Sequence, residues 1–369
     1  MIQIGLLGFG AMGKTHAYAV ENLKYFFSPL SFSAKIKGVC TAHKDTAQNA
    51  AQTYGFEKVY TSEEEMIADP TIDVIDICTP NCFHYDTICK AIAAGKHIYC
   101  EKPLCVTAEQ AFDVAQHAKD ANITAQIVFH NRFLTPVMRA KQLIADGRLG
   151  RIVSFRACYL HDSCTDLTKN AGWKQDRSIC GGGVLFDLGS HVMDLIYDLC
   201  GKFQTVIGRP QIAHPQRKGS HGETWTTNAD EAFYMIATME NGAMGTIEAS
   251  KLAVGTNDEL FVEIHGECGA LKFDLMDPNW LYFYDKTAPG GDLGGERGYT
   301  RIECVGRYPA PGGTFPSGKA PIDRIRGHVC SMYAFLDAVY RHHPASPSFE
   351  DAAHIQWAME QAYQSCGWA

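Results

Sequence analysis

Three residues suited to proton-transfer or metal chemistry follow a triple glycine in the second half of the chain. Asp187, His191 and Asp194 are spaced i, i+4 and i+7, so a helix over this segment places them on one face. A carboxylate, an imidazole and a second carboxylate on one face could ligate a metal ion. They could equally transfer protons, with Asp187 and His191 both reaching one substrate. The spacing alone leaves both chemistries open.

A second reactive side chain, Lys102, lies between Glu101 and Pro103 and directly follows a strand predicted over residues 96–100. The carboxyl ends of parallel strands face the ligand crevice of an α/β sheet, so we expect Lys102 to point into that crevice. The proline restricts Lys102 to an extended backbone. A lysine there can polarise a hydroxyl or carbonyl oxygen, and Glu101 can hold it in place. A solvated turn lysine is the alternative.

The chain begins with the pattern of a dinucleotide-binding turn. An apolar run over residues 2–7 predicts a buried strand, and residues 11–23 predict the helix after it. Gly8, Gly10 and Gly13 between them form G-x-G-x-x-G, which permits the tight turn, the approach of a pyrophosphate and close packing of the helix. The flanking elements favour this function over an ordinary turn. The predicted cofactor-binding residues of this segment are Gly8, Phe9, Gly10, Ala11, Met12 and Gly13.

The next predicted strand, residues 36–40, ends at Thr41 and not at a carboxylate. An acidic residue at this place hydrogen-bonds the adenosine ribose of NAD, and it would repel the 2′-phosphate of NADP. Thr41 can donate a hydrogen bond, and His43 or Lys44 could face the phosphate. Thr41 can also bind a plain ribose, and Asp45 lies close in the sequence. The expected cofactor is therefore NAD or NADP, with NADP accepted.

Other predicted ligand-facing residues follow strand ends or precede the triple glycine. A turn of Thr79, Pro80 and Asn81 ends the strand predicted over residues 73–78 and should line the cofactor, whereas His84 could equally be a helix-start residue. Trp173 beside Lys174 suits the apolar face and the hydroxyls of a sugar, and a loop anchored by one buried tryptophan is the alternative. The predicted cofactor-binding set adds Thr41, Thr79, Pro80, Asn81, His84, Glu101 and Lys102, and the predicted substrate-binding set is Lys102, Arg132, Trp173, Lys174, Asp187 and His191.

The composition excludes several classes of function. The chain has 369 residues, of which 46% are hydrophobic and 20% charged, and a net charge of −8 without a basic block, so nucleic acid is not an expected partner. No apolar run approaches the ~20 residues of a membrane span, and the N-terminus lacks a secretory pattern, so we expect a cytoplasmic protein that binds no membrane. The 14 cysteines form no C-x-x-C motif and are expected to be reduced. Zinc held by Cys78 and Cys82, or by Cys158, His161 and Cys164, lacks a second paired cluster, so no metal is predicted.

The length indicates two domains, and the second half has a different pattern from the first. Helices and buried strands alternate before residue 129. Segments 203–212, 229–238, 242–253 and 259–274 alternate hydrophobic and polar residues, which predicts an antiparallel sheet. Residues 286–320 are rich in glycine and proline and predict a long irregular loop. Residues 325–341 and 349–364 predict two closing helices.

Four motifs in order carry a family resemblance: GFGAMGKTH, the Thr79–Asn81 turn, AGKHIYCEKPL over residues 94–104 and GGGVLFDLGSHVMDL over residues 181–195. Together they resemble the Gfo/Idh/MocA family, which includes glucose–fructose oxidoreductase and inositol dehydrogenase. The resemblance implies an α/β protein with an N-terminal Rossmann dinucleotide-binding domain, residues 1–129, and a C-terminal α/β domain, residues 130–369, built on a large open, mostly antiparallel sheet. It also implies a homodimer or homotetramer.

The resemblance favours proton transfer over metal binding at the helix after the triple glycine. Asp187 and His191 match the family's D-x-x-x-H residues and Lys102 matches its EKP lysine, which makes these three the predicted catalytic residues, while Asp194 is interpreted as a structural partner. The implied reaction is hydride transfer between nicotinamide and a secondary alcohol of a sugar, cyclitol or glycoside. Three alternatives stay open: a glycosidase-type enzyme that works by transient oxidation, a non-catalytic cofactor-binding regulatory module, and a metal-dependent enzyme.

Overall fold

The computed structural model describes residues 1–219, 222–305, 308, 310–311, 315, 317, 321 and 323–368. They form two compact units, one of Met1–Phe133 with Arg307–Ala353 and one of Leu134–Gly306 with His354–Ala369. The functional domains predicted as 1–129 and 130–369 stay a prediction. In the division into compact units, the late segment Arg307–Ala353 belongs to the first unit.

The first unit is a parallel sheet with helices, as expected of a Rossmann domain. Its strands are β1 (Ile2–Leu7), β2 (Ala34–Cys40), β3 (Lys58–Val59), β4 (Val74–Ile77), β5 (His97–Cys100) and β6 (Ala125–Ile127). Its helices are α1 (Ala11–Phe26), α2 (Lys44–Tyr54), α3 (Glu63–Ala68), α4 (His84–Ala93), α5 (Ala108–Asp120) and α9 (Arg324–Arg341). The strand order is β3-β2-β1-β4-β5-β6, and every pairing is parallel. The order reverses at β1, which is where such sheets bind ligands.

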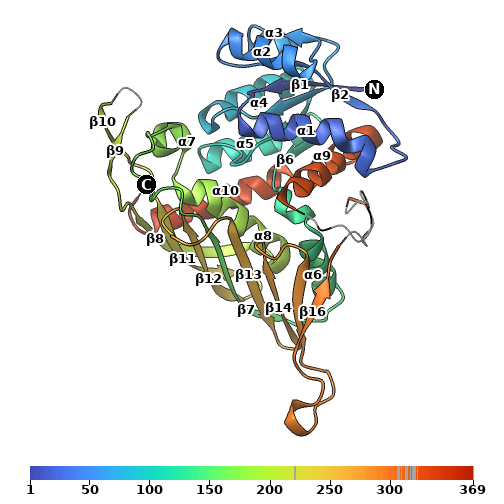
Figure 1. Ribbon diagram of the computed structural model, residues 1–369, viewed down its shortest axis with the longest axis vertical. Helices are drawn as coiled ribbons and strands as arrows, with labels where there is room; N and C mark the ends of the chain where they lie inside the picture. The colour runs from blue at the N-terminus through green and yellow to red at the C-terminus, as the bar shows by residue number, and fades with distance from the viewer. Residues whose placement is uncertain are drawn as a thin grey trace. The chain divides into compact units, whose positions relative to one another are not determined.

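Helix α9 completes the core of this unit although it lies about 200 residues beyond β6 in the sequence. Its buried Val329, Met332 and Phe335 share one apolar cluster with Val20 and Leu23 of α1. Figure 1 shows α9, in red, beside α1, in blue. The helix expected over residues 325–341 is therefore confirmed, and its apolar side is explained by burial against α1.

The second unit is built on a sheet of eight strands, in the order β16-β15-β14-β13-β7-β12-β11-β8. Their bounds are β7 (Ile152–Leu160), β8 (Phe203–Gln211), β11 (Ala232–Met239), β12 (Met244–Ser250), β13 (Glu259–Gly266), β14 (Gly269–Asp274), β15 (Trp280–Asp285) and β16 (Tyr299–Glu303). Only β7 and β12 among these pair in parallel, so the predicted mostly antiparallel sheet is confirmed. A separate small ribbon joins β9 (Gln216–Lys218) to β10 (Thr224–Thr226).

Helices α6 (Thr135–Ala145), α7 (Arg177–Cys180) and α8 (Ser190–Cys200) belong to this unit, together with most of α10 (Phe349–Gln364). Helix α8 packs on β7, β12 and β13, while α6 packs on β14 and β15. The segment Arg177–Cys200 is apolar and long enough to cross a membrane, but 83% of its most apolar window is buried inside the structure, as in the core helix of a globular domain.

Two expectations about the sheet were wrong. Residues 259–274 form two strands and not one, because a turn at Glu267 and Cys268 separates β13 from β14. The segment 286–320 is not irregular throughout, because β16 lies within it and pairs with β15. Most side chains of β16 are exposed, so the strand lacks the alternation that would have indicated it. Residues 306, 307, 309, 312–314, 316 and 318–320 of the predicted loop lie outside the described residues.

Candidate active site

The glycine turn after β1 has the geometry of a pyrophosphate cradle. Gly8 has φ +89°, and a Cβ there would lie 2.5 Å from the carbonyl oxygen of Cys78. A Cβ on Gly13 would lie 2.3 Å from the carbonyl oxygen of Gly8, so only glycine lets α1 approach the turn. Gly10, by contrast, is exposed and has no atom within 4 Å of its would-be Cβ. The first turn of α1 carries no acidic side chain, and the open space above its N-terminus fits a dinucleotide phosphate.

The side chain of Thr41, at the end of β2, makes a local hydrogen bond. Its hydroxyl donates to the carbonyl oxygen of His43 at 2.7 Å, just before α2 begins at Lys44. The first turn of α2 contains Asp45. The bond uses the hydroxyl proton and leaves an oxygen lone pair as an acceptor for a ribose hydroxyl.

His84 lies inside the fold, between the two predicted turns. It is fully buried, with Nδ1 3.0 Å from the carbonyl oxygen of Pro103 and Nε2 2.9 Å from that of Thr79. Burial lowers the pKa of His84, although the hydrogen bonds to the two carbonyl groups oppose the shift. The structure therefore gives His84 a buried position that joins the Thr79–Asn81 turn to the turn that contains Lys102.

Glu101 is buried and uses both carboxylate oxygens. Oε1 lies 3.1 Å from Nε2 of His16, and Oε2 accepts a hydrogen bond of 3.2 Å from the backbone N–H of Lys102. Burial opposes the ionisation of Glu101, but the hydrogen bond and charge of His16 outweigh it and lower the carboxyl pKa. Glu101 thus contacts the backbone of Lys102, and its predicted hold on the lysine side chain stays a prediction; the partner His16 was not predicted.

The helical segment with Asp187 and His191 is fixed at its start by a buried carboxylate. Asp230 accepts hydrogen bonds from the backbone N–H of Gly183 at 2.8 Å and of Leu185 at 3.0 Å, and also from the hydroxyl of Tyr363. A Cβ on Gly183 would lie 2.1 Å from the carbonyl oxygen of Asp230, so only glycine fits there. Burial raises the pKa of the Asp230 carboxyl although these hydrogen bonds oppose the shift.

The expected α-helix over this segment has a different first part. Residues Leu185–Gly189 form a π-helical turn, and α8 begins at Ser190. Asp187 therefore lies in the π turn, whereas His191 and Asp194 lie on α8. A π turn has more residues than an α turn, so the three side chains do not follow simple α-helical spacing. Such insertions are frequent at functional sites.

Asp187 is held by two lysine side chains. Nζ of Lys174 lies 2.9 Å from Oδ1 and 2.8 Å from Oδ2, and Nζ of the buried Lys251 lies 2.8 Å from Oδ2. Burial alone would lower the pKa of Lys251, but the charge and hydrogen bond of Asp187 outweigh it and raise that pKa. Lys174 also lies 5.6 Å from the ring centroid of Trp173, which is 38% exposed. The alternative of a buried tryptophan is excluded.

The remaining predicted residues differ in their surroundings. The His191 side chain is buried, with its ring edge-on to that of Tyr159 at 5.9 Å between centroids. Asp194 is also buried. Arg132, predicted to bind substrate, is buried and donates from Nη1 to Oδ2 of Asp351 at 3.1 Å. This pair fixes Arg132 in the first unit.

The potential metal ligands that gather in the described part of the chain are not the sets that were considered from the sequence. Two groups, one of His16, Glu101 and His328 and one of His16, Asp76 and Cys78, have ligand atoms within 4.8 Å of one another. Asp187, His191 and Asp194 are not among the groups found in the described residues, and neither are the cysteine sets considered for zinc. All 14 cysteines are free thiols.

The fold and the glycine cradle define a dinucleotide-dependent enzyme, and comparison with known proteins gives its family. Residues 2–129 match the model of the oxidoreductase family Gfo/Idh/MocA with its NAD-binding Rossmann fold, and residues 137–272 match the C-terminal domain of that family. The chain therefore belongs to the Gfo/Idh/MocA family and is an oxidoreductase with an NAD-binding domain, as the four sequence motifs predicted.

Individual relatives agree with this assignment over nearly the full chain. A levoglucosan dehydrogenase of Pseudarthrobacter phenanthrenivorans is 31% identical over 367 residues, which is 96% of this chain and 93% of the relative. A myo-inositol 2-dehydrogenase of Thermotoga maritima is 23% identical, covering 82% of this chain and 83% of the relative. A solved levoglucosan dehydrogenase in complex with NADH and levoglucosan superposes with a TM-score of 0.94, at 31% identity over 99% of this chain and 97% of that one.

Proposed function

We propose that the protein transfers a hydride between NAD and a secondary alcohol of a cyclic sugar, a sugar anhydride or a related polyol. The observation that carries the proposal is the cluster around Asp187, where two ammonium groups fix a carboxylate and one of them, Lys174, lies 5.6 Å from the ring centroid of the exposed Trp173. Ion-paired polar groups next to an aromatic face suit the hydroxyls and the apolar face of a sugar ring. The levoglucosan and inositol dehydrogenases among the relatives support this substrate class.

The proposed roles follow from the surroundings of each residue. Asp187 has its negative charge offset by Lys174 and Lys251, which makes it a poor proton acceptor and a good acceptor of substrate hydrogen bonds. His191 on the next turn is then the general base that removes the hydroxyl proton at an imidazole nitrogen. Lys102 stabilises the negative charge that develops on the substrate oxygen. NAD, when bound, supplies the redox chemistry by accepting the hydride.

Absorbance at 340 nm tests the reaction directly. Purified protein is supplied with NAD⁺ or NADP⁺ against a panel of anhydrosugars, free sugars, inositols and glycosides, and we expect a rise with at least one polyol class. The panel also tests the prediction that the carboxylate-free end of β2 accepts NADP. Aglycone release without NADH accumulation would identify the glycosidase-type reaction instead, and absence of turnover with every substrate would favour a regulatory module.

Two substitutions test the assigned residues. Lys102→Ala and His191→Ala should each lower kcat by roughly 10²-fold or more, the range of electrostatic and general acid–base contributions. Lys119→Ala is the control, because Lys119 is an exposed residue near the end of α5. Wild-type kcat in both variants would refute the assignment, and loss of activity after chelation would favour the metal-dependent alternative.

We also propose that the second unit associates with a second copy of the chain as a homodimer or homotetramer. Strands β8, β11 and β12 expose Ile207, Tyr234, Ile236 and Met244 on one sheet face, each about half accessible. Ile236 lies directly opposite Ile207 on the neighbouring strand, so the apolar side chains are contiguous. Sedimentation of the wild type and of Ile236→Lys is the test: we expect an oligomer that the lysine weakens, and a monomeric wild type would refute the proposal.

A further inference from the structure

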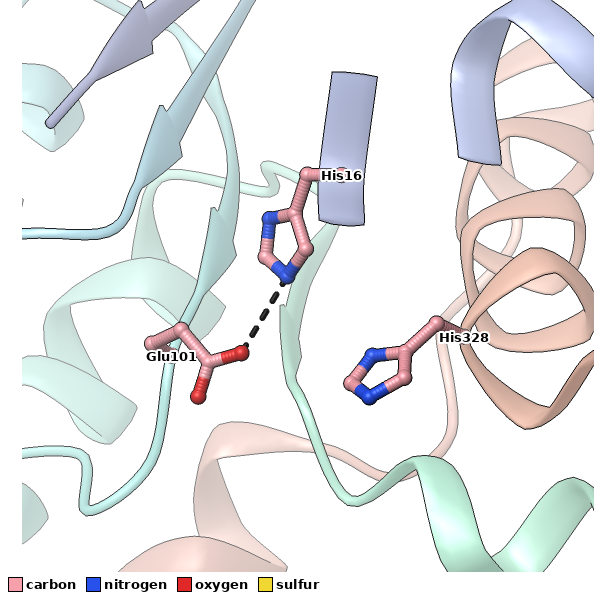
Figure 2. Close-up of side chains that lie close together, drawn as sticks. All are labelled: His16, Glu101 and His328. Atoms are coloured by element: carbon pink, nitrogen blue, oxygen red, sulfur yellow. Dashed lines mark hydrogen bonds and ion pairs between the residues drawn. The ribbon is translucent and has the colours of Figure 1, made fainter. Parts of the chain in front are cut away.

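A buried group of ionisable side chains lies behind the turn that contains Lys102. Figure 2 shows His16 of α1, Glu101 after β5 and His328 of α9, with a hydrogen bond from His16 to Glu101. The other ring nitrogen of His16, Nδ1, lies 2.8 Å from Oδ1 of Asp76 on β4. His16, Asp76, Glu101 and His328 are all more than nine-tenths buried. Nothing in the proposed chemistry uses this cluster directly.

The geometry sets the protonation of His16. Both ring nitrogens face carboxylate oxygens, so both must donate, and only the imidazolium can do that. A neutral ring would direct a lone pair at one of the two carboxylates. Burial opposes the charge, but Asp76 outweighs it, and the pKa of His16 lies well above its ordinary value.

The other described ionisable groups in the core that face His16, namely His328, Cys78 and Tyr99, carry no positive charge that could replace the imidazolium. Burial lowers the pKa of His328 to about 3, which leaves this imidazole neutral. Cys78 beside Nδ1 has its pKa raised to about 12 by burial and stays a thiol. Burial also raises the pKa of Tyr99, whose ring lies 5.1 Å from that of His16 and whose hydroxyl pairs with Ser331. His16 is therefore the cation that Asp76 and Glu101 share.

We propose that His16 is a positioning residue, which acts on the reaction by holding the Glu101–Lys102 turn. This inference rests on the proposed role of Lys102. The connection is short: His16 fixes one oxygen of Glu101, and the other oxygen accepts the backbone N–H of Lys102. Asp76 on the adjacent strand fixes His16 from the other side. Without the imidazolium, Glu101 would be a buried carboxylate that has lost its cation, and such a group protonates or moves.

The first test is a double-mutant cycle with a matched pair of substitutions. His16→Leu removes both donors, whereas His16→Gln keeps one, so we expect kcat to fall by about tenfold or more in the first and by less in the second, with KM changed by less than about threefold. In the Lys102→Ala background His16→Leu should cause no further loss, because its effect passes through the lysine. The exposed His343→Leu serves as the control.

The outcomes separate this inference from the proposed function. Wild-type kcat in His16→Leu, or losses that multiply in the double variant, would overturn the positioning role. Wild-type kcat in Lys102→Ala would instead refute the proposed function of that lysine. Circular dichroism and the affinity for NAD establish that each variant is folded. Stoichiometric zinc in the purified wild-type protein, lost in His16→Leu, would also overturn the proposal, because a metal would then take the place of the proton.

Asp76→Asn keeps the shape of the cluster and serves if the His16 variants do not fold. It removes the charge that stabilises the imidazolium, so His16 should lose its proton at a lower pH than in the wild type. We expect kcat of this variant to fall on the alkaline side at a pH where the wild type is still fully active. A merely structural role predicts a uniform loss, and parallel pH profiles would contradict the proposal.

Discussion

At the residue scale, the site differs from its prediction mainly in the partners of the predicted side chains. Lys251 is the clearest case, because it lies 64 positions beyond Asp187 in the sequence and directly follows the strand β12. Nothing in the alternating pattern of that strand distinguishes a lysine that points to solvent from one that is buried. His16 was likewise visible within the glycine motif, but its carboxylate partners come from β4 and from the turn after β5. Contacts of this kind depend on which strands are neighbours.

Removing the buried cation beside Asp187 should impair the enzyme more than removing the exposed one. Lys251→Met removes the buried cation from this carboxylate and keeps the half-exposed Lys174. We expect kcat/KM to fall by about tenfold or more in Lys251→Met, because one charge-assisted hydrogen bond of a buried group is worth roughly 1.5–3 kcal/mol. Lys174→Met is the comparison and should lose less. Equal values for Lys251→Met and the wild type in the 340 nm assay would contradict this role.

At the element scale, the local signals were predictive and the irregular elements were not. The strand–glycine–helix beginning is encoded by a hydrophobic run and by three glycines, of which Gly8 and Gly13 are required sterically within the fold, so neighbouring residues were enough to predict it. The π turn at Leu185–Gly189 requires no special residue type and left no signal in the sequence. The anchor of that turn, Asp230, lies 47 positions from Gly183 and belongs to a different part of the second unit.

This anchor should contribute substantially to stability. Asp230→Ala leaves the N–H of Leu185 and the hydroxyl of Tyr363 without their acceptor, at about 1–3 kcal/mol for each unsatisfied buried group, while the N–H of Gly183 keeps only the hydroxyl oxygen of Tyr363, 3.1 Å away. We therefore expect the free energy of unfolding to fall by roughly 2–4 kcal/mol in urea titrations followed by circular dichroism. Tyr363→Phe removes the hydroxyl, but the N–H of Gly183 keeps Asp230 as its acceptor, so this variant should lose about 1 kcal/mol. The prediction fails if the two variants are equally stable.

At the scale of the whole molecule, buried histidines make stability depend on pH. The pKa of His328 is about 3 in the folded protein because burial disfavours the charged ring, whereas an unfolded histidine has a pKa near 6.5. The contribution of His328 to the free energy of unfolding is therefore fully present above pH 6.5, and it is lost as the pH falls toward 3. His16 has the opposite sign, since its raised pKa gives stability that is present below pH 6.5 and lost at alkaline pH.

Comparison of unfolding at two pH values checks the acid side. When the pH is lowered from 7.5 to 5, His328 should reduce the free energy of unfolding of the wild type by up to about 2 kcal/mol. This figure follows from about 1.36 kcal/mol for each pH unit below 6.5. His328→Gln cannot titrate and should lose less over the same interval. Identical losses in the two proteins, measured by urea unfolding, would show that His328 does not stay neutral in the fold.

Helix α9 comes late in the sequence although it belongs to the first unit, and this has a consequence for folding during synthesis. A ribosome delivers β1 first and α9 roughly 320 residues later, so Val20 and Leu23 have no apolar cover from this helix while most of the chain is being made. The second unit, apart from its last 16 residues, is delivered before α9 is complete. The cofactor-binding unit therefore begins synthesis first and finishes folding late. A nascent chain arrested at residue 133 should be recognised by chaperones, although it already contains the whole glycine cradle.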